Sequence, residues 1–291
     1  CQKLEEFSFP EIEEEKNFWS IKIDRPYFLN MFTDLEFYQL DELVFDLSLY
    51  KYEEIIQDLQ KLKKKLLSGK LRLALPAIMR PEIDRRDWQQ EIKNFAKAGF
   101  ANWQIANLSA LELLSSAGIT AQDADISADW QLYVTNTAAA AALHELSLSK
   151  VTLSPDDNIR NFETLLGKLS SFAEVIVYAD IPLAISAVCT EICNSGHCPG
   201  KSTCDFEELQ LVSPKNDRLT AINRNCQSVY LNEQALNLSG NIAKLKQLNA
   251  RRFRADFMWK NYAPLQVKEI WQQLIEDKAQ ADNWTANLRF R

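Results

Sequence analysis

The sequence predicts an α/β fold close to a TIM barrel, with a cysteine-rich loop and a small α+β extension toward the C-terminus. Short apolar runs alternate with helical patterns over most of the chain, which is the arrangement of βα units around a parallel sheet. Seven such strands are predicted, so the barrel is expected to be incomplete or nearly complete. The 291 residues are enough for one core of this size.

The predicted strands are short apolar runs bounded by polar or turn-forming residues. They are Trp19–Asp24, Glu42–Leu47, Leu71–Ile78, Trp103–Asn107, Trp130–Thr135, Lys150–Leu153 and Glu174–Tyr178.

Helices are predicted between these strands. The segment Tyr52–Leu67 places Ile55, Leu59 and Leu62 on one face and ends before Gly69, as an amphipathic helix does. Ser109 and Thr137 are expected to be N-caps of the helices that they begin. The remaining predicted helices are Arg86–Ala98, Ser109–Ala117, Thr137–Leu146 and Asp156–Phe172.

Three regions are expected along the chain. Residues 1–17 are interpreted as a linker or N-terminal extension, residues 18–188 as the barrel-like domain, and residues 189–291 as a cysteine-rich segment with a C-terminal α+β region. The chain lacks an initiating Met and opens in an acidic stretch, so a piece of a longer polypeptide is expected. The last region is predicted to contain strands and helices at Glu207–Ser213, Leu219–Asn223, Ser228–Asn232, Asn237–Leu248, Arg251–Phe257 and Pro264–Ala279.

Polar residues at the ends of predicted strands are the candidate site residues, because functional loops of a parallel barrel follow the carboxyl ends of its strands. The alternative for each is a helix cap or a turn. The candidates are Asp24, Arg25, Arg80, Asn107, Asn136 and Tyr178, with Ser154 and Asp180 in the same ring.

Five of the six cysteines lie between Cys189 and Cys226, in a segment that also contains glycine and proline. Soft thiolate donors suit zinc, copper(I) or an iron–sulfur cluster. Disulfides are the alternative, although an odd number of cysteines leaves at least one thiol without a local partner. Scattered free thiols are the third interpretation. His197, between two of the cysteines, is a candidate ligand or a donor to a ligand.

Other catalytic patterns are missing from the sequence. It contains no dinucleotide-binding glycine motif, no P-loop, no nucleophile elbow and no zinc-protease motif, and it has only two histidines. The net charge of −7 argues against a broad electrostatic grip on nucleic acid. A local RNA contact through Arg251, Arg252 and Arg254 is expected, with a solvated basic edge as the alternative. No apolar run is long enough for a membrane span, and a cytoplasmic location is expected.

Several segments, in their order, resemble the collagenase-like peptidase family U32. They are Asn107–Leu114, Ala128–Asn136, Val151–Pro155, Val175–Leu183, Ser186–Cys189, Asp217-Arg218 with Cys226, and Arg254–Phe257. Ile21–Arg25 resembles the opening strand of the second barrel-like half of long members. The similarity runs from Trp19 to about Asp256, and it suggests a C-terminal half whose N-terminal half or partner subunit is missing.

The resemblance implies a function that differs from the family name. Studied relatives bind a four-iron cluster through four cysteines and support oxygen-independent hydroxylation of a ubiquinone precursor or of RNA bases. Carried over, it implies that Cys189 and Cys226 are ligands of a 4Fe-4S cluster. The other two ligands would come from the three cysteines between them. Cys198 and Cys204 are favoured, and Cys193 is the alternative ligand.

Two departures from the family pattern bear on the expected activity. The family has Gly-Arg after the strand-end tyrosine, where this chain has Ala179-Asp180, and its Ser-Pro-Glu turn reads Ser154-Pro155-Asp156. Arg25 or Arg80 is expected to replace the missing arginine. An iron–sulfur hydroxylation factor for an RNA base is therefore the first hypothesis. The alternatives are a peptidase and a non-catalytic scaffold domain stapled by a metal, with zinc as the alternative metal.

Overall fold

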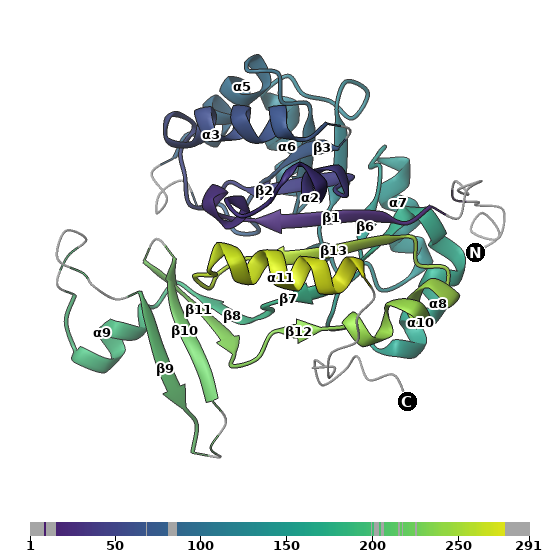
Figure 1. The fold of residues 1–291 in the computed structure, drawn as a ribbon. Helices are drawn as coiled ribbons and strands as arrows, with labels where there is room; N and C mark the ends of the chain where they lie inside the picture. Colours follow the sequence, from purple (N-terminus) through teal and green to yellow (C-terminus); the bar gives the residue numbers. More distant parts are fainter. Residues whose placement is uncertain are drawn as a thin grey trace.

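The computed structural model describes residues 9, 16–67, 69–80, 86–198, 200, 204, 207–214, 216, 218–224 and 226–276. Within them the chain forms a closed barrel of parallel strands surrounded by helices, with a second, smaller sheet at one end (Figure 1). The predicted TIM-barrel-like α/β fold is confirmed. Cys1 and the acidic stretch near the N-terminus lie outside the described residues.

Eight parallel strands form the barrel, and the pairing of β6 with β7 closes it. In spatial order they are β1 (Phe18–Ile23), β2 (Glu42–Asp46), β3 (Lys70–Ala74), β4 (Asn102–Ile105), β5 (Asp125–Ala128), β6 (Val151–Thr152), β7 (Ala173–Ala179) and β13 (Arg252–Phe257).

The eighth barrel strand comes from the region that was expected to form a C-terminal extension. β13 lies between β7 and β1 and pairs with both in parallel register. The barrel is therefore complete, because a strand far along the chain fills the gap between its first and seventh strands. About seventy residues separate β7 from β13, and they form the smaller sheet.

The fifth strand differs from its prediction. Trp130–Thr135 has the aromatic and β-branched composition of a strand, yet β5 is the more polar segment Asp125–Ala128 that precedes it. Trp130–Leu132 instead forms a short 3-10 helix, because the carboxylate of Asp129 accepts a hydrogen bond from the Trp130 backbone N–H at 2.8 Å and ends the strand.

The outer helices match their predicted positions to within a few residues at most ends. They are α3 (Tyr52–Lys65), α5 (Trp88–Lys97), α6 (Ser109–Ser116), α7 (Thr137–Glu145), α8 (Ile159–Leu169) and α11 (Pro264–Ile275), with short α2 (Asp34–Tyr38) after β1. Each longer helix turns apolar residues toward the barrel, as Ile55, Leu59 and Leu62 of α3 do. None of the helices in the described ranges is both long and apolar enough to cross a membrane.

The smaller sheet is antiparallel and has the order β8-β11-β10-β9. Its strands are β8 (Pro182–Ser186), β9 (Glu208–Val212), β10 (Arg218–Arg224) and β11 (Gln227–Asn232), and the short helix α9 (Thr190–Ser195) follows β8. Strand β12 (Leu236–Asn237) and helix α10 (Ile242–Gln247) lead back to the barrel. In Figure 1 the arrow of β1 points toward the side of the molecule that carries this sheet.

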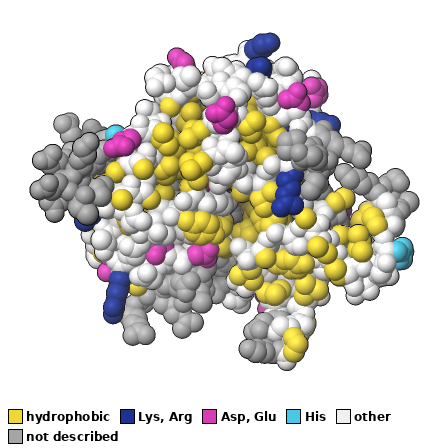
Figure 2. All heavy atoms as spheres, turned by 180° about the vertical axis from the view of Figure 1, so that it is seen from behind, with side chains coloured by type: hydrophobic (Ala, Val, Ile, Leu, Met, Phe, Trp, Pro, Cys, Tyr) yellow, Lys and Arg dark blue, Asp and Glu magenta, His cyan; other side chains and the backbone are white. Residues whose placement is uncertain are grey.

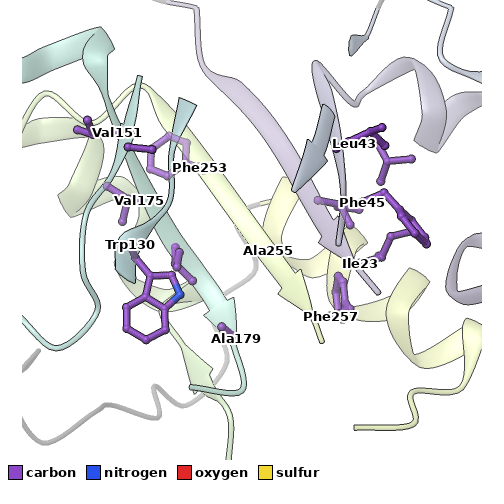
Figure 3. Close-up of a cluster of buried hydrophobic side chains, with 14 of the residues drawn as sticks. Ile23, Leu43, Phe45, Trp130, Val151, Val175, Ala179, Phe253, Ala255 and Phe257 are labelled. Carbon is purple, nitrogen blue, oxygen red and sulfur yellow. The ribbon is translucent and has the colours of Figure 1, made fainter. Parts of the chain in front are cut away.

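Barrel strands alternate between apolar residues that face the helices and polar or charged residues that face the interior. Phe253, Ala255 and Phe257 of β13 belong to the outer apolar core, part of which Figure 3 shows. Arg254, between them, contacts residues of other strands and is fully buried. This alternation is what a strand with two different faces requires.

Ion pairs cross the barrel interior from one wall to the other. Lys22 of β1 donates to Asp129, which follows β5, at 2.5 Å. Glu42 of β2 pairs with Lys150, which precedes β6. Since these strands lie on opposite sides of the barrel, their side chains can meet only through its interior. We call this set of buried charged side chains the interior ion network; it comprises Lys22, Glu42, Asp46, Arg72, Asp129, Lys150, Glu174, Arg254 and Asp256.

Glu174 is the most connected carboxylate of the network. It pairs with Lys150, accepts from Arg254 Nη1 at 3.2 Å and accepts from the hydroxyls of Ser20 and Thr152 at 3.0 Å each. Burial alone raises the pKa of a carboxyl group, but the charges of Lys150 and Arg254 outweigh it and lower the pKa of Glu174 to about 2. Glu174 is therefore ionised at neutral pH.

We expect the substitution Glu174→Gln to lower the free energy of unfolding by about 3 to 5 kcal/mol, because it leaves two buried cations short of a counter-charge. Urea unfolding of the two proteins measures this difference. The matched control is Asp58→Asn, which breaks the exposed pair of Asp58 with Lys61 and should cost less than about 1 kcal/mol. Equal costs for the two variants would contradict the structural importance of the network.

Stability should also fall in acid. The pKa of Glu174 is lowered from 4.5 to about 2, so its stabilising contribution is complete above pH 4.5 and disappears as the pH falls toward 2; the shift corresponds to about 3 kcal/mol. The pKa of Asp256 is raised by burial and changes stability in the opposite sense, which reduces the slope. Urea unfolding between pH 2 and 5 should show a smaller acid loss in Glu174→Gln than in the unsubstituted protein.

Candidate substrate site at the barrel mouth and the cysteine segment

A cavity of about 360 Å³ lies where the carboxyl ends of the barrel strands meet the smaller sheet. Its walls come from both parts of the fold, since Asp46 and Asp256 end barrel strands while Arg224 and Val229 belong to β10 and β11. The expectation that the strand ends of the barrel frame a pocket is consistent with this position. We call this space the mouth cavity.

Lys22 forms the floor of the mouth cavity, at the top of the interior ion network. Its ammonium donates to Gln104 Oε1 at 3.2 Å and to Asp129, and it lies 3.7 Å from Asp46 Oδ2. Burial by itself lowers the pKa of a lysine, but the carboxylates of Asp129 and Asp46 raise the pKa of Lys22. The floor therefore presents a protonated ammonium, which cannot serve as a base.

Asp256 lines the cavity beside Lys22. Both of its carboxylate oxygens accept from Arg254, at 2.6 Å from Nε and 2.9 Å from Nη2. Burial nevertheless raises the pKa of Asp256. Asp256 thus takes up a proton more readily than Glu174 deeper in the barrel.

Arg224 connects the smaller sheet to the barrel. Its Nη2 donates at 2.5 Å to Asp24 Oδ2 and at 2.5 Å to the carbonyl of Trp259. Asp24 also accepts from the Trp259 backbone N–H at 3.0 Å. Burial raises the pKa of Asp24, while the Arg224 charge opposes that rise.

Asp180, at the place where the family pattern has an arginine, also lines the mouth cavity. Lys260 donates to its Oδ1 at 2.7 Å, and the Tyr262 hydroxyl donates to its Oδ2. These two residues follow β13, so Asp180 ties the end of β7 to the segment after the eighth strand. Where the family pattern has an arginine, this chain has a carboxylate paired with Lys260 and Tyr262.

Two of the predicted site residues lie at the mouth in supporting positions. Asp24 holds Arg224 and is itself 1% exposed. Arg25 is half-buried; its Nη1 donates to the carbonyl of Lys260 at 3.0 Å, and its guanidinium lies 5.6 Å from the ring centre of Phe28. Neither is among the residues that line the cavity. Arg80 is exposed and also lies outside this lining.

Asn107 and Asn136 act as helix caps. The side-chain oxygen of Asn107 accepts from the Ala110 N–H at 3.0 Å, and that of Asn136 accepts from the Ala139 N–H at 2.8 Å. Both residues thus have the capping role that was the alternative for polar residues at strand ends, and neither lines the mouth cavity. The predicted caps Ser109 and Thr137 are the first residues inside their helices.

Tyr178 points away from the cavity. A register shift between β7 and β13 places Tyr178 beside Ala255 of the outward-facing set. Its ring packs 5.4 Å from that of Phe257 and 6.4 Å from that of Tyr262, and burial raises its pKa to about 12. Tyr178 is thus part of the outer core.

The predicted RNA contact is not compatible with the position of Arg254, which is 0% exposed inside the barrel. Arg251 and Arg252 lie where β13 begins, at the end of the barrel opposite the mouth. Arg251 donates to the Lys246 carbonyl at 2.9 Å, and Arg252 donates to the Ser171 carbonyl at 2.6 Å.

The five cysteines of the segment are free thiols. Cys189 and Cys193 lie at the start of α9 and one turn into it, Cys198 and Cys204 follow the helix, and Cys226 lies in the turn between β10 and β11. In the described part of the chain, no three His, Cys, Asp or Glu side chains lie close enough to hold a metal ion.

Strand pairing nevertheless brings the first and last of these cysteines to the same end of the smaller sheet. Ser186 of β8 is opposite Ser228 of β11, and the two strands are antiparallel. Cys189 follows Ser186 and Cys226 precedes Ser228, so both lie just beyond the same end. The Thr190 N–H donates to the Ser228 hydroxyl at 2.9 Å, which joins the two segments.

Little of the apolar surface of the smaller sheet is covered. Among the described residues, the buried apolar cluster of this sheet consists of Ile222, Val229 and Leu231. Leu183, Val188 and Val212 are each more than half exposed, and Figure 2 shows apolar side chains gathered on this part of the molecule.

Apart from Asp180, sequence reasoning missed the charged residues that line the cavity, chiefly Lys22, Arg224 and Asp256. The sequence around Lys22 and Asp256 does contain a pattern that could have identified them. Buried parallel strands are normally continuous apolar runs, whereas Ile21-Lys22-Ile23 and Arg254-Ala255-Asp256 alternate charged with apolar residues. Such alternation in a parallel barrel indicates a charged interior.

Solved structures similar to this chain include several barrel enzymes. A glycoside hydrolase family 18 N-acetylglucosaminidase from Paenibacillus barengoltzii has 8% identity and a TM-score of 0.48, over 90% of this chain and 100% of that one. The spore cortex-lytic enzyme SleL of Bacillus megaterium QM B1551 has 11% identity and a TM-score of 0.45, over 94% and 76%. An HpcH/HpaI aldolase from Desulfitobacterium hafniense DCB-2 has 9% identity and a TM-score of 0.43, over 92% and 96%.

No curated protein matches the chain in sequence. The model of one protein family does match, and it spans residues 43–289. This range includes seven of the barrel strands, the smaller sheet and the five clustered cysteines. The chain belongs to peptidase family U32.

Proposed function

We propose that this chain is an iron–sulfur protein that supports oxygen-independent hydroxylation of an RNA base bound in the mouth cavity. The observation that carries the proposal is the position of the cysteine segment. Arg224 and Gln227 line the cavity, and Cys226 lies between them in the same turn. Ile185 lines the cavity from β8, shortly before Cys189. A redox centre on this segment would lie next to the bound substrate.

The donor set fits an iron–sulfur centre in its chemistry. Five free thiols are available in the cytoplasmic setting that we expect, and thiolates are the ligands of such clusters. The resemblance assigns four of them, Cys189, Cys198, Cys204 and Cys226, with Cys193 as the alternative ligand and zinc as the alternative metal. Because the sulfurs are not gathered around one point in the described residues, the fit depends on donor type and on the place of these residues in the fold. When bound, a cluster would supply electron transfer.

The protein side chains would bind and orient the substrate. Lys22 and Asp256 form a charged floor, and Trp88, Trp130 and Trp259 contribute aromatic surface to the walls. Aromatic side chains stack on unpaired bases irrespective of their sequence. RNA backbone contacts are not assigned to Arg251 and Arg252, since those residues lie at the far end of the barrel.

The cavity gives less support to the peptidase alternative. A hydrolase needs an activated nucleophile with a base, or a metal-bound water. Ser48 lines the cavity, but neither histidine does, and Lys22 is held in its protonated form. The described lining therefore provides a serine hydroxyl without a histidine of the Ser–His kind.

Protein purified without oxygen should be brown and contain iron and sulfide. Replacing Cys189 or Cys226 by Ser should remove most of the visible absorption, because these two positions lie at the same end of the sheet. Cys193→Ser is the matched control on the same helix and should retain most of it. Visible spectra with iron and zinc analysis are the measurements, and colourless protein with one zinc per chain would refute the iron–sulfur assignment.

Deleting the gene should remove one hydroxylated base from the RNA of the host cell, and Cys189→Ser at the native locus should reproduce that loss. Mass spectrometry of nucleosides from digested RNA measures both. Restoring the unsubstituted gene is the control. An unchanged nucleoside profile, with cleavage of a denatured protein that survives Ser replacement of the cysteines, would instead support the peptidase.

A further inference from the structure

Strand β9 forms one edge of the smaller sheet (Figure 1). Among the described residues it pairs only with β10, in antiparallel register. An unpaired edge of this kind is a template for another strand, and proteins usually blunt it with lysine or proline. The strand Glu208–Val212 contains neither, and Glu208 is its only charged residue. The edge of β9 is therefore suited to pairing with a further strand.

The backbone groups of three β9 residues point toward this edge. In an antiparallel pair of strands, hydrogen-bonded residue pairs alternate with pairs that are not hydrogen-bonded. The Asn223 N–H donates to the Glu207 carbonyl at 3.0 Å, so the next hydrogen-bonded pairs with β10 are those of Leu209 and Leu211. The residues whose N–H and C=O groups point away from β10 are Glu208, Gln210 and Val212. Together they offer six backbone groups to a further strand.

A second copy of β9 would satisfy all six groups. When two antiparallel β9 strands are related by a two-fold axis at Gln210, each Gln210 lies opposite the other, and each Glu208 lies opposite the second copy's Val212. Every one of these pairs is hydrogen-bonded, because the paired residues turn their backbone groups outward on both strands. Moving the axis to Leu209 or to Leu211 pairs only four of the six groups. The direction of the backbone groups thus selects one self-complementary, isologous pairing.

Leucines on the outward face of β9 match in the same pairing. Ile222 lies opposite Val229, which lines the mouth cavity, so Ile222 marks the face of the sheet that is turned toward the barrel. The strand register places Leu209 and Leu211 on the other face, where both are partly exposed. Each Leu209 would lie opposite the second copy's Leu211, and such apolar cross-strand pairs stabilise a sheet. Helix α9 begins over β11, two strands away from this edge, where Thr190 contacts Ser228.

Charges on the face turned toward the barrel are complementary as well. Glu208 would lie opposite Val212 of the second copy, so no carboxylate faces another carboxylate. Val212 is paired with Arg218 of β10, and each Glu208 would therefore share a row of the sheet with the second copy's Arg218, about 10 Å away between Cα atoms. Arg218 is exposed, and its ion pair with Glu233 is long, at 3.7 Å. The pairing thus adds two attractive charge pairs and no repulsive one.

We propose that this chain forms a two-fold symmetric dimer in which the β9 strands of two copies pair edge to edge. The two smaller sheets would then form one continuous antiparallel sheet, with the order β8-β11-β10-β9 in one copy followed by the reverse order in the other. A two-fold axis perpendicular to this sheet keeps each face on its own side, so both mouth cavities would lie on the same side of it. The inference does not depend on the proposed function.

Sedimentation velocity of the full chain, purified without oxygen and measured over a wide range of concentrations, tests the dimer. We expect an equilibrium between monomer and dimer. Gln210→Lys should weaken the dimer at least about tenfold, because it places two like charges opposite each other at the axis. Gln60→Lys is the matched control. It makes the same substitution at an exposed position of α3 and should leave the equilibrium unchanged.

A proline substitution separates pairing from folding. The Gln210 N–H points away from β10, so Gln210→Pro removes no strand hydrogen bond within one copy, whereas in the dimer it removes both hydrogen bonds at the axis. We expect this variant to weaken the dimer at least about tenfold and to keep the melting temperature of the unsubstituted protein. Leu211→Pro is the comparison. The Leu211 N–H belongs to a hydrogen-bonded pair with β10, so this variant should melt at a lower temperature.

A cysteine at the axis tests the register of the pairing. Opposite Cα atoms of a hydrogen-bonded antiparallel pair lie about 5.5 Å apart, which is within the range of a disulfide. Mild oxidation of Gln210→Cys should therefore link two copies through this position, and mass mapping of the linked peptides distinguishes this bond from bonds of the natural cysteines. Glu208→Cys is the control. It should not link to itself, but it should link to Val212→Cys when the two variants are mixed.

A monomer at every concentration would overturn the proposal, as would a dimer that persists in both Gln210→Lys and Gln210→Pro. Oligomers larger than a dimer would also overturn it, because a two-fold pairing of one edge closes at two copies. A link of Glu208→Cys to itself, without a link of Gln210→Cys, would contradict the register on which the proposal rests. A brown, iron-containing monomer would leave the iron–sulfur proposal intact while this inference falls.

Discussion

The interior ion network is the constraint on which the rest of the fold depends. A barrel interior is usually filled by branched apolar side chains, but here residues such as Arg254, Glu174 and Lys150 meet across it with almost no exposure. A buried charge is tolerated only when its partners are in place. Each barrel strand therefore has to keep its register, because a shift by one residue would move its charges into the apolar shell under the helices.

The position of the smaller sheet is also fixed by paired charges. In the described residues its buried apolar cluster consists of Ile222, Val229 and Leu231, so apolar packing contributes little to holding this sheet in position. The Arg224–Asp24 pair attaches it to the end of β1, and the segment after β7 is attached through Asp180 to Lys260 and Tyr262. The walls of the mouth cavity are thus held by hydrogen-bonded charges on two sides.

Most helices could be predicted from the sequence because their apolar periodicity is local. Strands were less predictable where pairing with distant segments of the chain determines their place in the sheet. Nothing in Arg252–Phe257 itself indicates that it joins β7 to β1, since that pairing depends on residues far away in the chain. The same limit applies to the site. Asn107 and Asn136 satisfy a strand-end rule and a helix-cap rule equally well, and the capping role becomes visible only in the hydrogen bonds to Ala110 and Ala139. Arg224 could not be found, because its partner Asp24 is 200 positions away.

Recognition and redox chemistry would share one short turn in this protein. Arg224 ends β10, Gln227 begins β11, and Cys226 lies between them with a φ of 65°, a left-handed conformation that is uncommon for a residue other than glycine. The Cys226 N–H donates to Asn223 Oδ1 at 3.0 Å, which holds the turn in this shape. A metal bound to the Cys226 thiolate would therefore act on a turn flanked by Arg224 and Gln227, which line the cavity. Asp24 holds Arg224 from the barrel side, so the Arg224 guanidinium links a fixed carboxylate to the cysteine turn. A metal bound at Cys226 would therefore affect first the wall of the mouth cavity that Arg224 forms.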